Sequence, residues 1–214
     1  MYVVDVRFSL SGTVIPVDHG YALFSAISNV IPEFHGADDI GIHHIGGNVA
    51  GNRTQLITEQ SFLTIRLPAD RFGNVMPLAG KVLKLGDNEI RVGVPHSRAL
   101  IPNASLYSRL VVIKGFMEPE SFLAAAQRQL DALRISGVAH LVNQPLIAEA
   151  NEGSVSGTHS PFLRRTIRIH DKEIVGFALR TDQLTAEESL LLQEKGIGGR
   201  RRFGCGIFIP DRKH

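Results

Sequence analysis

The residues with the clearest chemical potential lie near the end of the chain, at residues 195–206. This stretch holds five glycines and four basic residues. Glycine lets backbone N–H groups approach a phosphate closely, while arginine forms paired hydrogen bonds to phosphate and stacks on unpaired bases. The stretch therefore predicts a phosphate-binding loop, although three adjacent arginines alone would also suit a solvated basic turn.

Two common nucleotide-binding motifs do not fit this loop. A Walker loop needs Gly-Lys followed by Ser or Thr after its glycines, and residues 195–206 do not supply that order. A dinucleotide-binding glycine pattern precedes a helix, whereas this loop precedes a strand expected at residues 206–209. Both nucleotide interpretations are therefore excluded by their context.

Histidine side chains form the second group with chemical potential. Four of the nine histidines lie early in the chain: His19, His35, His43 and His44. Imidazole has an unperturbed pKa of about 6.5, so it can accept or donate a proton near neutral pH. His43 and His44 are neighbours on an expected strand, so at most one of them should face a shared site. The group indicates acid–base chemistry.

A metal site is the alternative for part of this group. His35, Asp38, Asp39 and the two neighbouring histidines fall within ten positions, and imidazole with carboxylate is a known ligand set. The segment has no HExxH pattern, and its glycines give no fixed face for ligands. The single cysteine, Cys205, excludes a zinc ribbon and an internal disulfide. We therefore expect neither a metal ion nor a cofactor.

The elements that must position these residues follow a regular order in the first half of the chain. Apolar residues alternate at 4–10, which predicts a strand, and recur at helical spacing at 19–31, which predicts a helix that Pro32 ends. The other elements expected there are strands at 55–58 and 62–67, a short helix at 70–78, and a hairpin of 81–85 with 89–94.

The second half repeats this order. Thr185 and Glu188 have the spacing of a capping box, which predicts the start of a helix. Residues 143–161 are polar and rich in Gly and Ser, which is typical of a loop. The other elements expected are a strand at 110–113, a helix at 119–133, a hairpin of 163–169 with 173–179, and a last strand at 206–209.

The element order predicts an α+β fold of two tandem ferredoxin-like units, each βαββαβ. The expected domains are residues 1–102, which carry the early histidines, and residues 103–214, which carry the glycine-rich loop 195–206. The chain of 214 residues is long enough for two such domains.

Composition is that of an ordinary globular protein. The formal net charge is only +2, although the sequence pI is about 8.9, so the location of the basic residues matters more than their number. Charged residues interrupt the N-terminal apolar stretch, and no apolar run approaches the ~20 residues needed to span a bilayer. With its single cysteine the chain is expected in the cytoplasm, away from membranes.

Three segments resemble the RAMP superfamily of CRISPR-associated proteins, and within it the endoribonuclease that cuts repeat-containing precursor RNA. They are residues 16–23 at the first helix, residues 34–43 after it, and residues 196–210 with the glycine-rich loop. With the element order, the resemblance covers essentially the whole chain.

This resemblance implies an enzyme that cleaves RNA without a metal ion. The ribose 2′-OH attacks the adjacent phosphorus and leaves a 2′,3′-cyclic phosphate and a 5′-OH. The implied substrate is CRISPR precursor RNA, cut within its repeats to make guide RNAs. Other subunits of a CRISPR effector complex are further partners that the resemblance allows.

The resemblance also implies site residues. The family draws its catalytic histidine from the first helix or the loop after it, which favours His35, then His43, then His19. Tyr21 could donate a proton or orient a phosphate; packing is the alternative for both His19 and Tyr21. The RNA-binding residues implied are Lys195, Gly196, Gly198, Gly199, Arg200, Arg201 and Arg202, with Arg165 extending the basic surface.

Two other functions remain open from the sequence. A non-catalytic RAMP subunit that coats guide RNA would keep the glycine-rich loop but need no histidine beside it. A metal-dependent nuclease would use the His and Asp group and would lose activity in a chelator.

Overall fold

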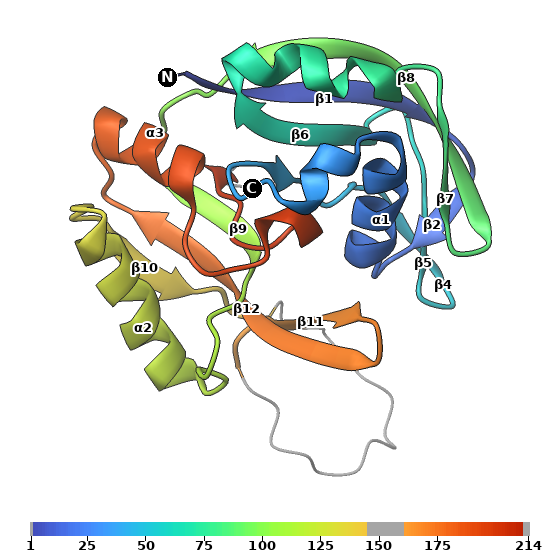
Figure 1. Cartoon of the computed structure of the whole chain (residues 1–214). Coiled ribbons are helices and arrows are strands. Elements are labelled where there is room, and N and C mark those ends of the chain that lie inside the picture. The colour runs from blue at the N-terminus through green and yellow to red at the C-terminus, as the bar shows by residue number, and fades with distance from the viewer. Residues whose placement is uncertain (1, 145–160, 212–214) are drawn as a thin grey trace, which may run out of the picture.

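The computed structural model describes residues 2–144 and 161–211. Within these ranges the predicted α+β class is confirmed, with two five-stranded sheets, a three-stranded sheet and helices packed beside them (Figure 1). Most of the loop expected at residues 143–161 lies outside the described residues. None of the described helices has the length and apolar character needed to cross a membrane.

The first half contains eight strands, one α-helix and two 3-10 helices. Their bounds are β1 Val3–Ser11, β2 Val14–Pro16, α1 Gly20–Val30, η1 Pro32–His35, β3 Gly41–Ile42, β4 Asn48–Gly51, β5 Thr54–Leu56, β6 Phe62–Pro68, η2 Ala69–Leu78, β7 Val82–Leu85 and β8 Asn88–Ala99. The predicted helix at 19–31 and the predicted strand at 62–67 therefore form almost where the periodicity put them.

The larger sheet of this half has the strand order β3-β6-β1-β8-β7, and its strands are antiparallel. Alternation along β1 turns Val6 and Phe8 into the core, which α1 and η2 complete with Leu23 and Val75. The smaller sheet, β2-β5-β4, extends from the end of β1.

The described residues of the second half contain five strands, two α-helices and one 3-10 helix. Their bounds are β9 Leu106–Val111, α2 Pro119–Ala132, β10 Val138–Leu141, β11 Arg164–Ile169, β12 Lys172–Asp182, α3 Ala186–Lys195, η3 Arg201–Phe203 and β13 Ile209–Pro210. The capping box is confirmed, because the Thr185 side chain accepts from the N–H of Glu188 and the Glu188 carboxylate accepts from the N–H of Thr185.

The sheet of the second half has the order β10-β12-β9-β13, and β11 pairs with the first part of β12. β10 and β11 lie end to end along the same edge of β12, since β10 pairs with residues 179–182 and β11 with residues 172–177. Both α2 and α3 pack into the second core, around Phe122, Phe177 and Leu192.

Two strands lie elsewhere than the sequence predicts. The strand expected at 110–113 ends at Val111, because the Val112 carbonyl instead accepts the N–H of Gly199 (2.9 Å). The last strand is Ile209–Pro210 and not 206–209, since Gly206 has a φ of +64°, outside the strand region. The sequence does not predict β2, β4 or β10, because such short strands carry little alternation. The strand expected at His43 and His44 ends earlier, since β3 is Gly41–Ile42.

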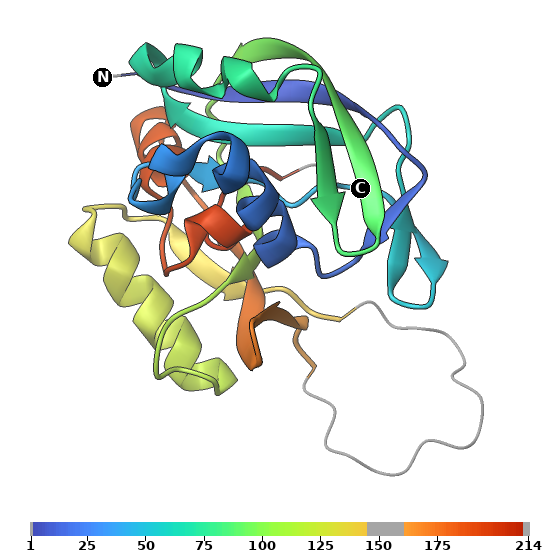
Figure 2. The ribbon, with the colours of Figure 1, turned by 45° about the vertical axis from the view of Figure 1, so that its right-hand side comes forward.

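The two halves meet along α1, β3 and the glycine-rich loop. The η3 turn lies directly beside α1 in both views, and the β11–β12 hairpin runs beneath that helix (Figure 1 and Figure 2). On the side of the second half, a small cluster of buried residues, including Leu110, Ile167 and Cys205, packs against Phe203 of the loop. This junction places the early histidines next to the loop at the end of the chain.

Candidate active site

A cleft of about 250 Å³ opens at the junction of the two halves. Its basic lining comes from both halves: His44 and Arg53 from the first, and Arg109, Arg164 and Arg165 from the second. The rest of the lining is Val17, Asp18, Gly20, Leu110, Thr166, Ile167, Phe203 and Gly204. A cleft lined by four arginines and one carboxylate favours an anionic ligand.

The wall of the cleft is fixed by contacts between α1 and the second half. The Asp18 carboxylate accepts the backbone N–H of Arg168 on β11 (2.8 Å). A Cβ atom at Gly20 would lie 2.5 Å from the carbonyl oxygen of Phe203, so the start of α1 packs directly on the glycine-rich loop. Residue types at these two positions therefore set the distance between the halves.

His44 is the imidazole that lines this cleft. Its ring stacks on that of His19, with centroids 4.2 Å apart. Burial, together with the positive charges of Arg109 and Arg165, holds the pKa of His44 well below its ordinary value. The ring is therefore neutral at pH 7, which is the form that can accept a proton.

His19 lies behind His44 and is completely buried. Its Nδ1 donates to the carbonyl of Pro16 (2.8 Å), and its Nε2 accepts the N–H of Ile45 (3.0 Å). Burial lowers the pKa of His19 to about 4. Because both ring nitrogens are engaged with backbone groups, His19 supports His44 and does not reach the cleft itself.

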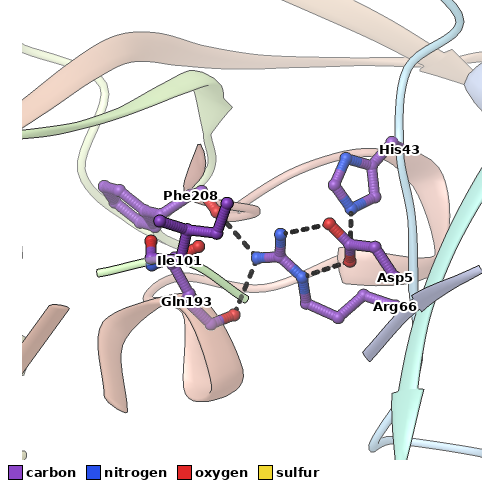
Figure 3. A network of polar contacts seen from close by, with 6 residues as sticks. All are labelled: Asp5, His43, Arg66, Ile101, Gln193 and Phe208. Carbon is purple, nitrogen blue, oxygen red and sulfur yellow. Dashed lines mark hydrogen bonds and ion pairs between the residues drawn. The ribbon is translucent and has the colours of Figure 1, made fainter. Parts of the chain in front are cut away.

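His43 points away from the cleft, as the alternation of neighbouring side chains requires. Its Nε2 lies 3.4 Å from Asp5 Oδ1, and Asp5 is bound by the guanidinium group of Arg66 (Figure 3). Burial lowers the pKa of His43, although the neighbouring Asp5 carboxylate acts in the opposite direction. Burial alone would raise the pKa of Asp5, but its bonds to Arg66 and His43 hold that pKa far below the usual range.

His35 is exposed at the end of η1 and lies beside the glycine-rich loop. Its ring packs edge-on against Phe24 (5.5 Å), and its backbone carbonyl accepts a hydrogen bond from Arg202. Arg202 also donates to the Phe34 carbonyl (3.2 Å). The structure thus brings His35 and the loop together, but His35 is not part of the lining of the cleft.

Tyr21 lies on α1, one residue after Gly20 of the cleft. Its hydroxyl is 3.1 Å from Nε2 of His170, at the turn between β11 and β12, and the two rings are 4.7 Å apart. The ring of Phe203 also packs against Tyr21, with the two ring centroids 6.0 Å apart. Tyr21 and His170 thus form a hydrogen-bonded pair, one residue from each half.

The glycine-rich loop borders a second cavity of about 260 Å³, on the other side of Phe203. Its lining is Asp38, Ile40, Gly198, Gly199, Arg200, Arg201, Arg202 and Phe203. Nε and Nη2 of Arg201 are buried and have no hydrogen-bond partner among the residues that the structure describes. Burial and the charge of Arg66 lower the pKa of Arg201 to about 10, so it stays a cation. Lys195 is exposed at the end of α3 and lines neither cavity.

Most glycines of the loop serve packing inside the protein. A Cβ atom at Gly196 would collide with the carbonyl oxygen of Gly206, and one at Gly206 with that of Ile197. A Cβ atom at Gly198 would lie 2.5 Å from the carbonyl oxygen of Val112, which is also too close. Gly199, by contrast, has open space around it and borders the second cavity. The loop is therefore built tightly, and Gly199 is where a phosphate could approach its backbone.

Several residues that the structure brings to this site are not among those predicted from the sequence. Arg109 alternates with Leu110 on β9, but the expected strand began one residue too late to include it. Arg53 lies in the turn between β4 and β5, and its local sequence carries no signal. His44 is one of the four early histidines and His170 has no motif around it, so only the tertiary contacts bring them to this site.

Acidic and imidazole groups do not gather into a metal site in the described parts of the chain. No group of three or more His, Cys, Asp or Glu side chains there could hold an ion. Asp39 pairs with Arg71 (2.8 Å), and His43 pairs with Asp5. Asp39 and His43, two of the side chains considered as metal ligands, thus contact different residues and not a shared site.

Comparison with known proteins gives concordant matches along the chain. Residues 4–213 match the protein family described as Cas6 Crispr. Over 210 residues the chain is 36% identical to the CRISPR-associated endonuclease Cas6 of Myxococcus xanthus (strain DK1622), covering 98% of this chain and 82% of that protein.

Solved structures share the fold at low sequence identity. A CRISPR associated protein Cas6 superposes with a TM-score of 0.68 at 13% identity, covering 98% of this chain and all of that one. A structure described as a RAMP protein binding different RNA substrates has a TM-score of 0.67 at 10% identity, covering 99% of this chain and 100% of the other.

Proposed function

Because the chain belongs to the Cas6 family of CRISPR-associated endonucleases, we propose that it cuts CRISPR precursor RNA within repeats without a metal ion. The products are guide RNAs with 2′,3′-cyclic phosphate and 5′-OH ends. The observation that carries this proposal is the position of the His44 imidazole in a cleft lined by four arginines. RNA brings the phosphate and the 2′-OH that such a site can use.

In the proposed reaction, His44 takes the proton of the 2′-OH as that oxygen attacks the adjacent phosphorus. The bond from phosphorus to the 5′ oxygen breaks, and the leaving oxygen receives a proton from a second group. The exposed Tyr21–His170 pair is suited to this step, because its two groups share a hydrogen bond and lie beside the cleft. Arg109 and Arg165 stabilise the negative charge on the phosphorane.

The glycine-rich loop grips the RNA backbone next to the cleft. Arg200, which is exposed and borders the second cavity, offers donors for a phosphate oxygen there. Phe203 borders both cavities, so a strand that occupies one can continue into the other. His35, which lies beside Arg202 of the glycine-rich loop, remains a candidate for one of the two proton transfers.

The proposal includes a fold of two ferredoxin-like units, residues 1–102 and residues 103–214. Numbered in βαββαβ order, the strands of each unit would lie 2-3-1-4 in the sheet. The orders β3-β6-β1-β8 and β10-β12-β9-β13 support this assignment. In the first unit a 3-10 helix, η2, stands in for the second helix, and β7 is an added edge strand.

The experiment that tests this function is cleavage of a labelled repeat RNA in excess EDTA, with the product ends mapped. We expect a specific cut with a 2′,3′-cyclic phosphate. The variant His44→Ala should lower the single-turnover rate by about 10²–10⁴-fold, the usual contribution of a general base, while RNA binding stays within a few-fold. His96→Ala, an exposed histidine on β8, is the matched control and should cut normally.

The variants Tyr21→Phe, His170→Ala and His35→Ala rank the candidates for the second proton transfer. Tight binding of the RNA without cleavage in any buffer would contradict the proposed endonuclease activity. It would favour the alternative, a non-catalytic subunit that coats guide RNA. Cleavage that returns only with added metal ions would contradict the metal-independent mechanism.

A further inference from the structure

Arg66 is a fully buried arginine that joins both ends of the glycine-rich loop to the first half of the chain (Figure 3). One nitrogen, Nη1, donates to the carbonyl of Gln193 (2.9 Å) and to that of Phe208 (2.7 Å). Gln193 lies in the last turn of α3, just before the loop, and Phe208 lies just after it. A single atom therefore holds the entry and the exit of residues 195–206.

The other edge of the Arg66 guanidinium is fixed by Asp5 on β1. Nε lies 2.7 Å from Asp5 Oδ1, and Nη2 lies 2.9 Å from Oδ2, which is a paired contact in one plane. Arg66 and Asp5 are also directly opposite in the register of β6 and β1. The carboxylate thus orients the guanidinium so that Nη1 faces the two carbonyls of the second half.

The same network continues to the cleft and to the loop itself. His43 contacts Asp5, and the next residue is His44 of the cleft. Arg201 of the loop reaches the same region: its Nη2 would lie 3.6 Å from a Cβ atom added at Gly41. Gly41 pairs with Arg66 across β3 and β6. Arg66 is therefore central to the region where cleft and loop meet.

We propose that Arg66 is a positioning residue for RNA binding: it sets the geometry of the glycine-rich loop without touching RNA. This inference rests on the proposed role of the loop in gripping the RNA backbone. Lysine cannot replace it, because an ammonium group lacks the planar array of donors that reaches one carboxylate and two carbonyls together. Without Arg66 the two carbonyls and Asp5 lose their shared partner, and the loop ends are no longer tied to the first half.

The test uses Arg66→Lys and Asp5→Asn in the full chain, with Arg71→Lys as the matched control. Arg71 also pairs with an aspartate but is exposed. We expect Arg66→Lys to weaken RNA binding by about tenfold or more, Asp5→Asn to weaken it less, and Arg71→Lys to leave it unchanged. Amide exchange at residues 196–206 should rise in both variants, measured below their melting temperatures, while exchange in β1 and β9 stays slow.

A double-mutant cycle separates positioning from general destabilisation. Arg200 is exposed and borders the second cavity. Arg200→Gln should weaken RNA binding in the wild-type background and much less in the Arg66→Lys background, because a displaced loop no longer presents Arg200 to RNA. Full additivity of the two changes overturns the inference. If Arg66→Lys does not fold, unchanged RNA binding by Asp5→Asn overturns it instead. Failure of the wild type to bind RNA would refute the proposed function, which is a different result.

Discussion

His19 and His44 are stacked neighbours with different tasks. His19 uses both ring nitrogens for backbone contacts, and His44 presents its ring to the cleft. Burial keeps both rings neutral, so that the positively charged arginines around them are not opposed by a further cation. At the scale of single residues, the position of the His44 ring thus depends on a histidine that does not itself line the cleft.

The buried His19 makes stability depend on pH. Its pKa is about 4 in the folded protein and about 6.5 in the unfolded chain, so the unfolded chain takes up the proton first as pH falls. Its contribution is complete above pH 6.5, and about 3 kcal/mol is lost between pH 6.5 and 4. Urea titrations at pH 7 and pH 5 measure the change in unfolding free energy.

The variant His19→Gln is the comparison for this prediction. It should be less stable at pH 7, and its stability should fall less between pH 7 and 5 than that of the wild type. His43 and His44 also have lowered pKa values and add to the fall in both proteins. Parallel pH curves for the two proteins would contradict the assignment of the effect to His19.

At the scale of elements, the glycine-rich loop is a packed structure and not an open anion cradle. The N–H of Gly199 donates to Val112 (2.9 Å), and the N–H of Gly206 donates to Leu110 (2.8 Å), so the loop follows the end of β9. The helix before it is fixed by the capping box of Thr185 and Glu188. Such anchoring limits how far the loop arginines can move.

Two neighbouring glycines of the loop should respond differently to alanine. Gly198 has a φ of +75°, and its Cβ position is 2.5 Å from the Val112 carbonyl oxygen, so Gly198→Ala should cost about 1–3 kcal/mol of unfolding free energy. Gly199 has open space, and Gly199→Ala should change stability by less than about 0.5 kcal/mol. Urea denaturation of the two variants measures both values.

The RNA affinity of the Gly199→Ala variant is the second measurement. Gly199→Ala should weaken RNA binding although it folds normally, since the added methyl group lies where a phosphate would approach the second cavity. Equal stability losses at both positions would contradict the packing of the loop described above.

At the scale of the whole molecule, four positively charged arginines gather in the cleft where the two halves meet. The formal net charge is only +2, yet Arg53, Arg109, Arg164 and Arg165 line one cleft. Burial and the neighbouring charge of Arg165 lower the pKa of Arg109 to about 10, which leaves it protonated at neutral pH. The site therefore holds cations together at an electrostatic cost that a bound phosphate backbone would relieve.

RNA affinity should accordingly fall steeply with salt concentration. For single-stranded RNA each phosphate contact contributes roughly 0.7 to the slope of log affinity against log salt. Arg109→Ala should reduce that slope by about 0.7, whereas Arg91→Ala, an exposed residue on β8, should leave it unchanged. Fluorescence anisotropy across a salt series measures the slopes, and equal effects of the two variants would contradict binding in the cleft.

The sequence by itself determined the elements whose signals are local. The alternation in β1, the helical spacing of α1 and α2, and the capping box of α3 depend on neighbouring residues, and they formed where the pattern predicted. The motifs at residues 16–23 and 196–210 also led to the family, because short-range residue order carries that resemblance. The α+β class followed from the order of these elements.

Only the tertiary structure decided which side chains face the site. His35, His43 and His44 lie within ten residues of one another, but contacts with Arg202, Asp5 and the arginines of the second half give them different partners. The two carbonyl partners of Arg66 lie more than a hundred residues away, and its carboxylate partner Asp5 lies 61 residues away, so no local pattern could identify that arginine. Contacts of this kind arise only when the two halves pack together, which is the physical reason that the site could not be assigned from sequence alone.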